Sequence, residues 1–105
     1  MYRIAVIGGA DSVIGFQALG LDTYPAQDGA SAKAILHDLV KIEEDPYVII
    51  YLEETLAQTI QDEVRKYSSR PSPAIILIPG RDGPIGLGRN ALQQAVEKAV
   101  GSNIL

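Results

Sequence analysis

The chain has 105 residues, a net charge of −4 and no cysteine. This length fits one domain, residues 1–105, which buries about two thirds of the surface that its unfolded form exposes. Without cysteine the chain forms no disulfide, thiolate zinc site or cysteine nucleophile, and its few scattered basic residues do not favour a nucleic-acid partner.

Apolar runs are short, and they are the sign of strands. Residues 4–7, 47–52 and 74–78 are almost continuously apolar, as in strands that are covered on both faces. Residues 21–26 are a weaker extended stretch. A membrane-spanning helix needs about 20 apolar residues, and no apolar run is that long. The start of the sequence lacks a signal-peptide pattern. We therefore expect a soluble, cytoplasmic protein without membrane insertion.

A first helix is predicted between the first two strands. Asp11 is the expected N-cap, and Gly20 suits the C-terminal end. Val13, Phe16 and Leu19 repeat at helical spacing, which predicts that they face the sheet.

Two further helices follow the second and third strands. Asp28 or Gly29 opens one of them, and residues 53–67 form the other, with a capping box at Thr55 and Gln58 if that helix begins later. Both carry a stripe of apolar residues with helical period, which predicts that they pack on the sheet. The two stripes are Ala32, Ile35, Leu36, Leu39 and Val40, and Leu56, Ile60, Val64 and Tyr67.

The last part of the chain predicts a turn, a strand, a loop and a helix. The segment "SSRPSP" cannot continue a helix, and Pro79 ends the strand that follows it. A loop, "GRDGPIGLG", leads into a final amphipathic helix at about residues 90–101. Four strands alternating with four helices require right-handed crossovers and a parallel sheet. The expected fold is a small doubly wound α/β domain, Rossmann-like or flavodoxin-like, one unit short of the usual five strands.

Glycines between a first strand and a first helix suggest a phosphate site, but their spacing does not fit one. In the fingerprint G-x-G-x-x-G, a start at Gly8 places Ala10 and Val13 where glycines are needed. Gly15 and Gly20 have P-loop separation, but the required Lys and Ser or Thr do not follow. An Asp11 carboxylate that caps the helix would also occupy the amides that a phosphate uses. We predict no nucleotide cofactor.

Other catalytic arrangements are also incomplete. A receiver domain needs an Asp at the end of its third strand and a late Lys, whereas this chain has Glu53 and Glu54, which we interpret as helix-start residues. His37, the single histidine, shares a polar helix face with Lys33 and Lys41 and is predicted to be a solvated surface residue. We predict no catalytic residue and no metal site.

With these segments placed, the chain resembles the F subunit of the rotary A-type/V-type ATPases. The resemblance rests on "RIAVIGGADSVIGFQALGLD", "YVIIYLEETLAQTIQDEV", "PAIILIPGRDGPIG" and the terminal "AVEKAVG", in this order. The motif positions of the first stretch are Asp11, Ser12, Gly15, Phe16 and Gly20. We interpret Gly15 as allowing close packing and Phe16 as the buried anchor of the helix.

The resemblance implies a non-catalytic rotor subunit of the central stalk, peripheral to the membrane through the ATPase complex. In that family, the F subunit binds the coiled-coil D subunit, and the pair links ATP hydrolysis or synthesis to rotation and ion transport. The alternative is a receiver-like or nucleotide-binding regulatory domain. Arg81 lies at the ligand-binding edge of the sheet, where Asp82-Gly83-Pro84 favours a turn. The predicted partner interface is Arg81, Pro84, Ile85, Leu87, Leu92 and Val96, and the last two are equally consistent with core positions.

Overall fold

Strands and helices alternate along the chain in its computed structural model, which describes residues 3–80. The predicted alternation is confirmed there, and no described helix has the length and apolar character needed to cross a bilayer. The predicted helix at 90–101 lies outside the described residues. The elements are β1 (Arg3–Gly8), α1 (Ala10–Ala18), β2 (Asp22–Pro25), α2 (Gly29–Val40), β3 (Tyr47–Glu53), α3 (Glu54–Ala57), α4 (Gln61–Ser68) and β4 (Ala74–Ile78).

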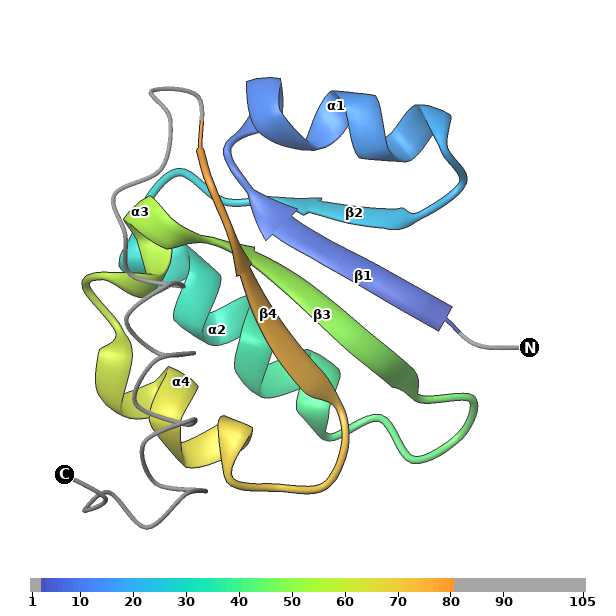
Figure 1. The fold of residues 1–105 in the computed structure, drawn as a ribbon, viewed down its shortest axis with the longest axis vertical. Helices are drawn as coiled ribbons and strands as arrows, with labels where there is room; N and C mark the ends of the chain where they lie inside the picture. Colours follow the sequence, from blue (N-terminus) through green and yellow to red (C-terminus); the bar gives the residue numbers. More distant parts are fainter. Residues whose placement is uncertain (1–2, 81–105) are drawn as a thin grey trace, which may run out of the picture.

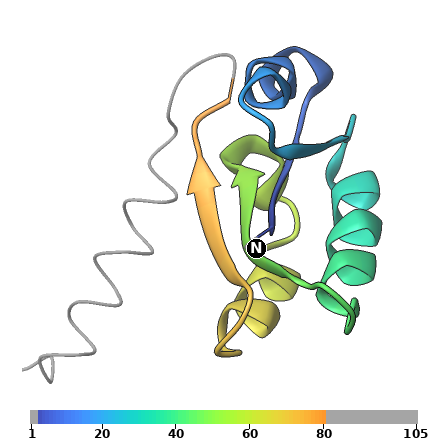
Figure 2. The ribbon, with the colours of Figure 1, turned by 90° about the vertical axis from the view of Figure 1, so that its right-hand side faces the viewer.

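The described strands form one parallel sheet in the order β2-β1-β3-β4. The chain winds from β1 to β2 on one side and then crosses to β3 on the other. Right-handed crossovers therefore place α1 on one face and the later helices on the opposite face. In Figure 1, α1 lies at the top of the view and α2 and α4 lie at the lower left. Figure 2, a quarter turn away, shows α1 at the top and α2 on the right. The predicted doubly wound fold is confirmed.

The main hydrophobic core lies between the sheet and α2, α3 and α4. Ile7 of β1, Ile50 and Leu52 of β3 and Leu36 of α2 are fully buried in it. The predicted inward stripe of α2 is confirmed, since Ala32, Leu36 and Leu39 are buried and Ile35 and Val40 pack against the core. Of the two residues expected to open this helix, Asp28 is the N-cap, and its carboxylate accepts a hydrogen bond from the Ser31 amide at 2.8 Å.

The continuous helix predicted over residues 53–67 is wrong. The chain forms α3, leaves helical geometry at Ile60 (φ −130°, ψ 38°) and begins again as α4. The Thr59 hydroxyl donates to the Leu56 carbonyl at 3.0 Å. A Cβ atom on Gly29 would overlap the Thr59 side chain, so the break accommodates the start of α2. The apolar stripe faces the core as predicted, but Thr55 bonds Glu53 rather than forming a capping box.

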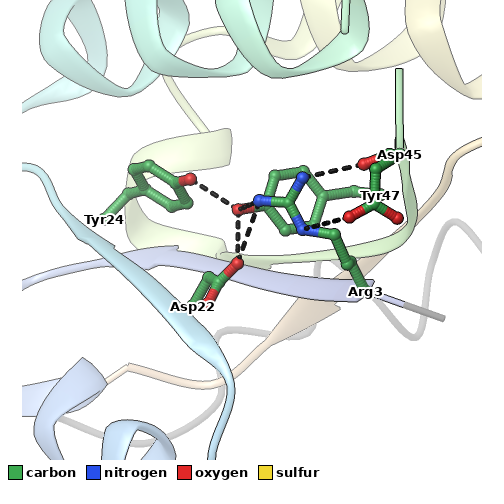
Figure 3. A network of polar contacts seen from close by, with 5 residues as sticks. All are labelled: Arg3, Asp22, Tyr24, Asp45 and Tyr47. Atoms are coloured by element: carbon green, nitrogen blue, oxygen red, sulfur yellow. Dashed lines mark hydrogen bonds and ion pairs between the residues drawn. The ribbon is translucent and has the colours of Figure 1, made fainter. Parts of the chain in front are cut away.

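The start of the sheet is held by a polar network, shown in Figure 3. The Tyr47 hydroxyl donates to the Asp22 carboxylate at 2.6 Å, and Arg3 donates to that carboxylate at 3.2 Å and to the Tyr47 oxygen at 2.7 Å. The Tyr24 hydroxyl lies 2.5 Å from that of Tyr47. Arg3 also donates to the Asp45 carbonyl at 2.7 Å. These contacts connect the first residues of β1, β2 and β3.

The network shifts the titration of its members. The hydrogen bond from Tyr47, and then that from Arg3, hold the pKa of the Asp22 carboxyl below its ordinary value of 3.8. Burial, and then the bond to Asp22, raise the pKa of the Tyr47 hydroxyl. The bond to Asp22 is also the largest cause of a raised pKa at Arg3.

The lowered pKa of Asp22 predicts an acid-dependent loss of stability. A carboxyl whose pKa is lower in the folded state stabilises fully above its unfolded pKa and loses that contribution as pH falls through the folded value. We expect the difference in free energy of unfolding between wild type and Asp22→Asn to be constant near neutral pH and to shrink below about pH 4. Urea unfolding measures this difference. Tyr47→Phe should reduce the pH dependence, and a flat difference down to about pH 2.5 would contradict the prediction.

Candidate functional site

The carboxyl ends of the strands form the edge of the sheet at which doubly wound domains bind their ligands. β2 and β3 lie on opposite sides of β1, so the chain changes its winding direction at this point. Three backbone segments meet there: the turn at Gly8 and Gly9, the end of β3 at Glu53, and Gly80 after β4.

The side chain of Glu53 fills this edge and is only 7% exposed. Its Oε2 accepts a hydrogen bond from the Gly9 amide at 2.7 Å, and its Oε1 accepts one from the Thr55 hydroxyl at 3.0 Å. A Cβ atom on Gly8 would lie 2.7 Å from Oε2, and one on Gly80 would overlap Oε1. These two glycines therefore allow the backbone to approach an internal carboxylate closely.

The predicted N-cap role of Asp11 is wrong. Gly9, with extended backbone angles (φ −62°, ψ 151°), precedes the first helical residue, and no side chain within residues 3–80 caps α1. The helix starts one residue before Asp11, which is exposed in the first turn, where a negative charge complements the helix dipole. The anion at the Gly9 amide is Glu53 instead, and a phosphate at this turn would meet its charge.

An open hollow of about 430 Å³ lies at the same edge, between the start of α1 and the end of β4. Its lining residues are Asp11, Ser12, Phe16, Pro79 and Gly80. The edge thus brings together the motif residues Asp11, Ser12 and Phe16. In the described part of the chain, the His, Asp and Glu side chains form no group of three that suits a metal ion.

Fewer residues of α1 than predicted face the sheet. Val13 is buried, and Phe16 is half-buried with its ring stacked on Tyr51 of β3, the two ring centroids being 6.3 Å apart. Phe16 therefore faces the sheet as predicted, without being a fully buried anchor. Truncation of a completely buried Phe to Ala lowers the free energy of unfolding by about 3 to 5 kcal/mol, and we expect Phe16→Ala to lower it by less.

The outer face of α1, which we define as Ile14, Gly15, Ala18 and Leu19, is apolar and exposed. Ile14 is 67% and Leu19 is 75% exposed. The predicted inward position of Leu19 is wrong, because a helix turn of about 100° per residue rotates it roughly 90° from the side shared by Val13 and Phe16. Large apolar side chains on the outer side of a helix are typical of a covered surface, yet residues 3–80 leave Ile14 and Leu19 exposed.

Within residues 3–80, nothing packs closely on Gly15 in the way that the sequence suggested. Among residues 3–80, no atom lies within 4 Å of the position that a Cβ atom would take there. Gly20, in contrast, ends α1 as predicted. It has a φ of +88°, and the Leu21 amide donates to the Phe16 carbonyl at 3.3 Å, as in a Schellman motif.

The interface predicted from the end of the chain is not among the described residues. These positions are Arg81, Pro84, Ile85, Leu87, Leu92 and Val96.

Comparison with known proteins gives the family. The family model described as ATP synthase (F/14-kDa) subunit matches residues 4–96. The chain belongs to this family. It is 38% identical to the F subunit of the V-type ATP synthase of Clostridium botulinum, over 98% of this chain and 97% of the relative. It is 39% identical to that of Fusobacterium nucleatum, over 100% of this chain and 97% of the relative.

Archaeal relatives are more distant but align over most of their length. The chain is 28% identical to the F subunit of the A-type ATP synthase of Methanosphaera stadtmanae, over 93% of this chain and 92% of the relative. The resemblance to the F subunit of the A-type/V-type ATPases is therefore confirmed.

The most important residue of this edge was missed by sequence reasoning. Glu53 was interpreted only as a helix-start residue, and it does immediately precede α3, but its side chain makes no cap bond to that helix. The available signal was the position of Gly8, Gly9 and Gly80 at the ends of two different strands. Such glycines indicate that a side chain approaches the backbone there.

Removal of the Glu53 carboxylate should destabilise this family member. Glu53→Ala leaves the Gly9 amide without its acceptor, and we expect a loss of about 1 to 3 kcal/mol in the free energy of unfolding. Glu53→Gln retains an acceptor oxygen and should lose less. Urea unfolding measures both, with the exposed loop variant Glu43→Ala as control. Equal stability of Glu53→Ala and the control would contradict the structure.

Gly15 of α1 and Gly20, which follows the end of this helix, should respond in opposite directions to substitution. Gly15→Ala should stabilise the chain by about 0.5 to 1 kcal/mol, because the helix interior has room for a methyl group. Gly20→Ala should destabilise it by about 1 to 2 kcal/mol, because its φ is positive. Thermal and urea unfolding of the two variants test this, and shifts of the same sign would show that the end of α1 is misassigned.

Proposed function

We propose that the chain is a non-catalytic rotor subunit of the central stalk of a V/A-type ATP synthase. It binds the coiled-coil D subunit and couples ATP hydrolysis or synthesis to rotation and ion transport. The complex holds it at the cytoplasmic side, peripheral to the membrane. The single observation that supports this function most is the apolar outer face of α1, which residues 3–80 leave uncovered in a member of an ATP synthase family.

The chemistry of this face suits a helical partner. Gly15 and Ala18 are small, so a neighbouring helix is able to approach to the 8 to 10 Å that helix packing requires. Ile14 and Leu19 supply the large side chains that insert between residues of the facing helix, as in coiled coils. The only charged residue of α1 is Asp11 in its first turn, one turn before Ile14 and Gly15 on the same side. An apolar partner surface therefore fits the later turns of this face, at Ile14, Ala18 and Leu19.

The size of the interface requires more than α1. A specific interface buries about 800 Å² on each partner, whereas one face of a helix of 9 residues offers only part of that area. The predicted interface residues between Arg81 and Val96 follow β4, which ends at the same edge as the start of α1. We propose that both segments contact the D subunit.

The edge formed by the carboxyl ends of the strands favours a role in protein binding over a role in nucleotide binding. The Glu53 carboxylate takes the Gly9 amide, which is the donor that a phosphate-binding turn would present.

Co-expression with the cognate D subunit tests the proposal. Gel filtration of the wild-type chain should give a stable one-to-one complex. Ile14→Ser with Leu19→Ser should weaken binding by about tenfold or more, because two exposed apolar side chains lose their contact area. The matched control is Ala30→Ser with Ala34→Ser, on an exposed side of α2, and it should bind as wild type does.

Two results would contradict the proposal in distinguishable ways. Separate elution of two folded wild-type proteins would refute binding to the D subunit. If the double variant in α1 still forms the complex, the D subunit remains the partner, but the outer face of α1 is not the binding surface.

A further inference from the structure

A second surface lies across the sheet from α1, where α2 packs beside α4. The Tyr67 ring is 3% exposed, and its hydroxyl lies 2.7 Å from Nδ1 of His37. Lys66 Nζ is 5.5 Å and Arg70 Cζ is 5.2 Å from the centre of this ring. We call these residues, His37, Lys66, Tyr67 and Arg70, the Tyr67 cluster. His37 is exposed as predicted, although its ring nitrogen also joins α2 to α4.

The two cations of the cluster differ from their neighbours in the groups that they contact. Lys33 is paired with Glu63 at 3.5 Å, and Arg65 with Asp62 at 3.3 Å. Within residues 3–80, Lys66 and Arg70 form no ion pair and lie over Tyr67 instead. The acidic residues of α4 are in its first turn, at the opposite end of the helix.

Helix electrostatics explains why cations are tolerated here. Lys66 is in the last turn of α4, and Arg70 follows its end, where the helix dipole favours positive charge. The dipole does not explain why two cations converge on one ring with no described carboxylate between them, on a chain of net charge −4. Such a pair offers a docking point for negative charge from outside the chain.

We propose that the Tyr67 cluster binds an acidic segment, rich in Asp or Glu, of a partner protein in the ATP synthase complex. Arg70 provides the planar donor geometry that carboxylates accept, and Lys66 adds a second charge. Because both side chains already rest on the ring of Tyr67, less conformational freedom is lost when a carboxylate binds. The inference rests on the proposed function only in that the chain acts inside this complex.

The small size of the cluster favours a peptide carboxylate over a larger polyanion. Nucleic acids require many phosphate contacts, and anionic membranes are recognised by clusters of about 4 to 8 basic residues. In Figure 1, α4, which carries Lys66 and Tyr67 of the cluster, lies at the lower left of the view and α1 at the top, so the two proposed surfaces are separate.

Rebinding to the complex tests the cluster. The probe is the cognate ATP synthase purified from cells that lack this chain, with binding followed over about 50 to 300 mM NaCl. Lys66→Gln with Arg70→Gln should bind about tenfold more weakly than wild type and with a flatter salt dependence. The matched control, Lys33→Gln with Arg65→Gln, makes the same change in net charge and should bind as wild type does. Lys66→Arg with Arg70→Lys should retain binding.

Several results would overturn the inference. Equal binding of wild type and the Gln variant of the cluster, with both folded by circular dichroism, rejects the cluster as a docking point. Equal weakening by the control shows a general charge effect and also rejects it. If the Gln variant of the cluster binds phosphatidylglycerol vesicles less well than wild type but binds the complex equally well, the cluster binds lipid instead of a protein segment. Failure of the wild-type chain to bind the complex at all refutes the proposed function as well.

Discussion

The contact between the Glu53 carboxylate and the Gly9 amide organises the functional edge of this domain. It joins the turn after β1 to the end of β3, and the close approach of Gly80 brings the end of β4 to the same carboxylate. Because the side chain is nearly buried, its oxygens need the donors that Gly9 and Thr55 provide. The start of α1 and the hollow lined by Asp11, Ser12 and Gly80 lie beside this contact.

This contact also links the fold to its proposed use. Doubly wound domains bind phosphates at this edge through free amides and the start of a helix. Here a carboxylate from the same chain takes one of those amides, and α1 exposes Ile14 and Leu19 on its other side. In the proposed function, the same architecture supports binding surfaces in place of a phosphate site.

The two proposed surfaces differ in their chemistry as well as in their position. The outer face of α1 is apolar and contains small residues, so it suits a helix packed closely against it. The Tyr67 cluster is cationic and lies beyond the opposite face of the sheet, so it suits carboxylates. A domain between two partners in a complex benefits from this difference, because neither partner competes well for the surface of the other.

The strands and the α2 stripe were predictable because burial on both faces leaves a continuous apolar run, and burial on one side leaves a helical period. Leu36 and Ile50 followed these rules. The break between α3 and α4 was not predictable in this way, since Leu56, Ile60 and Tyr67 keep the period of a single helix across it. The break lies where Thr59 comes close to Gly29, a residue far away in the chain.

The sequence alone determined the fold class, the strand positions, the cap at Asp28 and the turn at Gly20, because these depend on local patterns and backbone geometry. The resemblance of its ordered motifs also identified the family. Only the tertiary structure decided which carboxylate meets the Gly9 amide, which side of α1 stays uncovered by residues 3–80 and which cations gather on Tyr67. Each of these depends on distances between residues from different elements, and no local pattern records such distances.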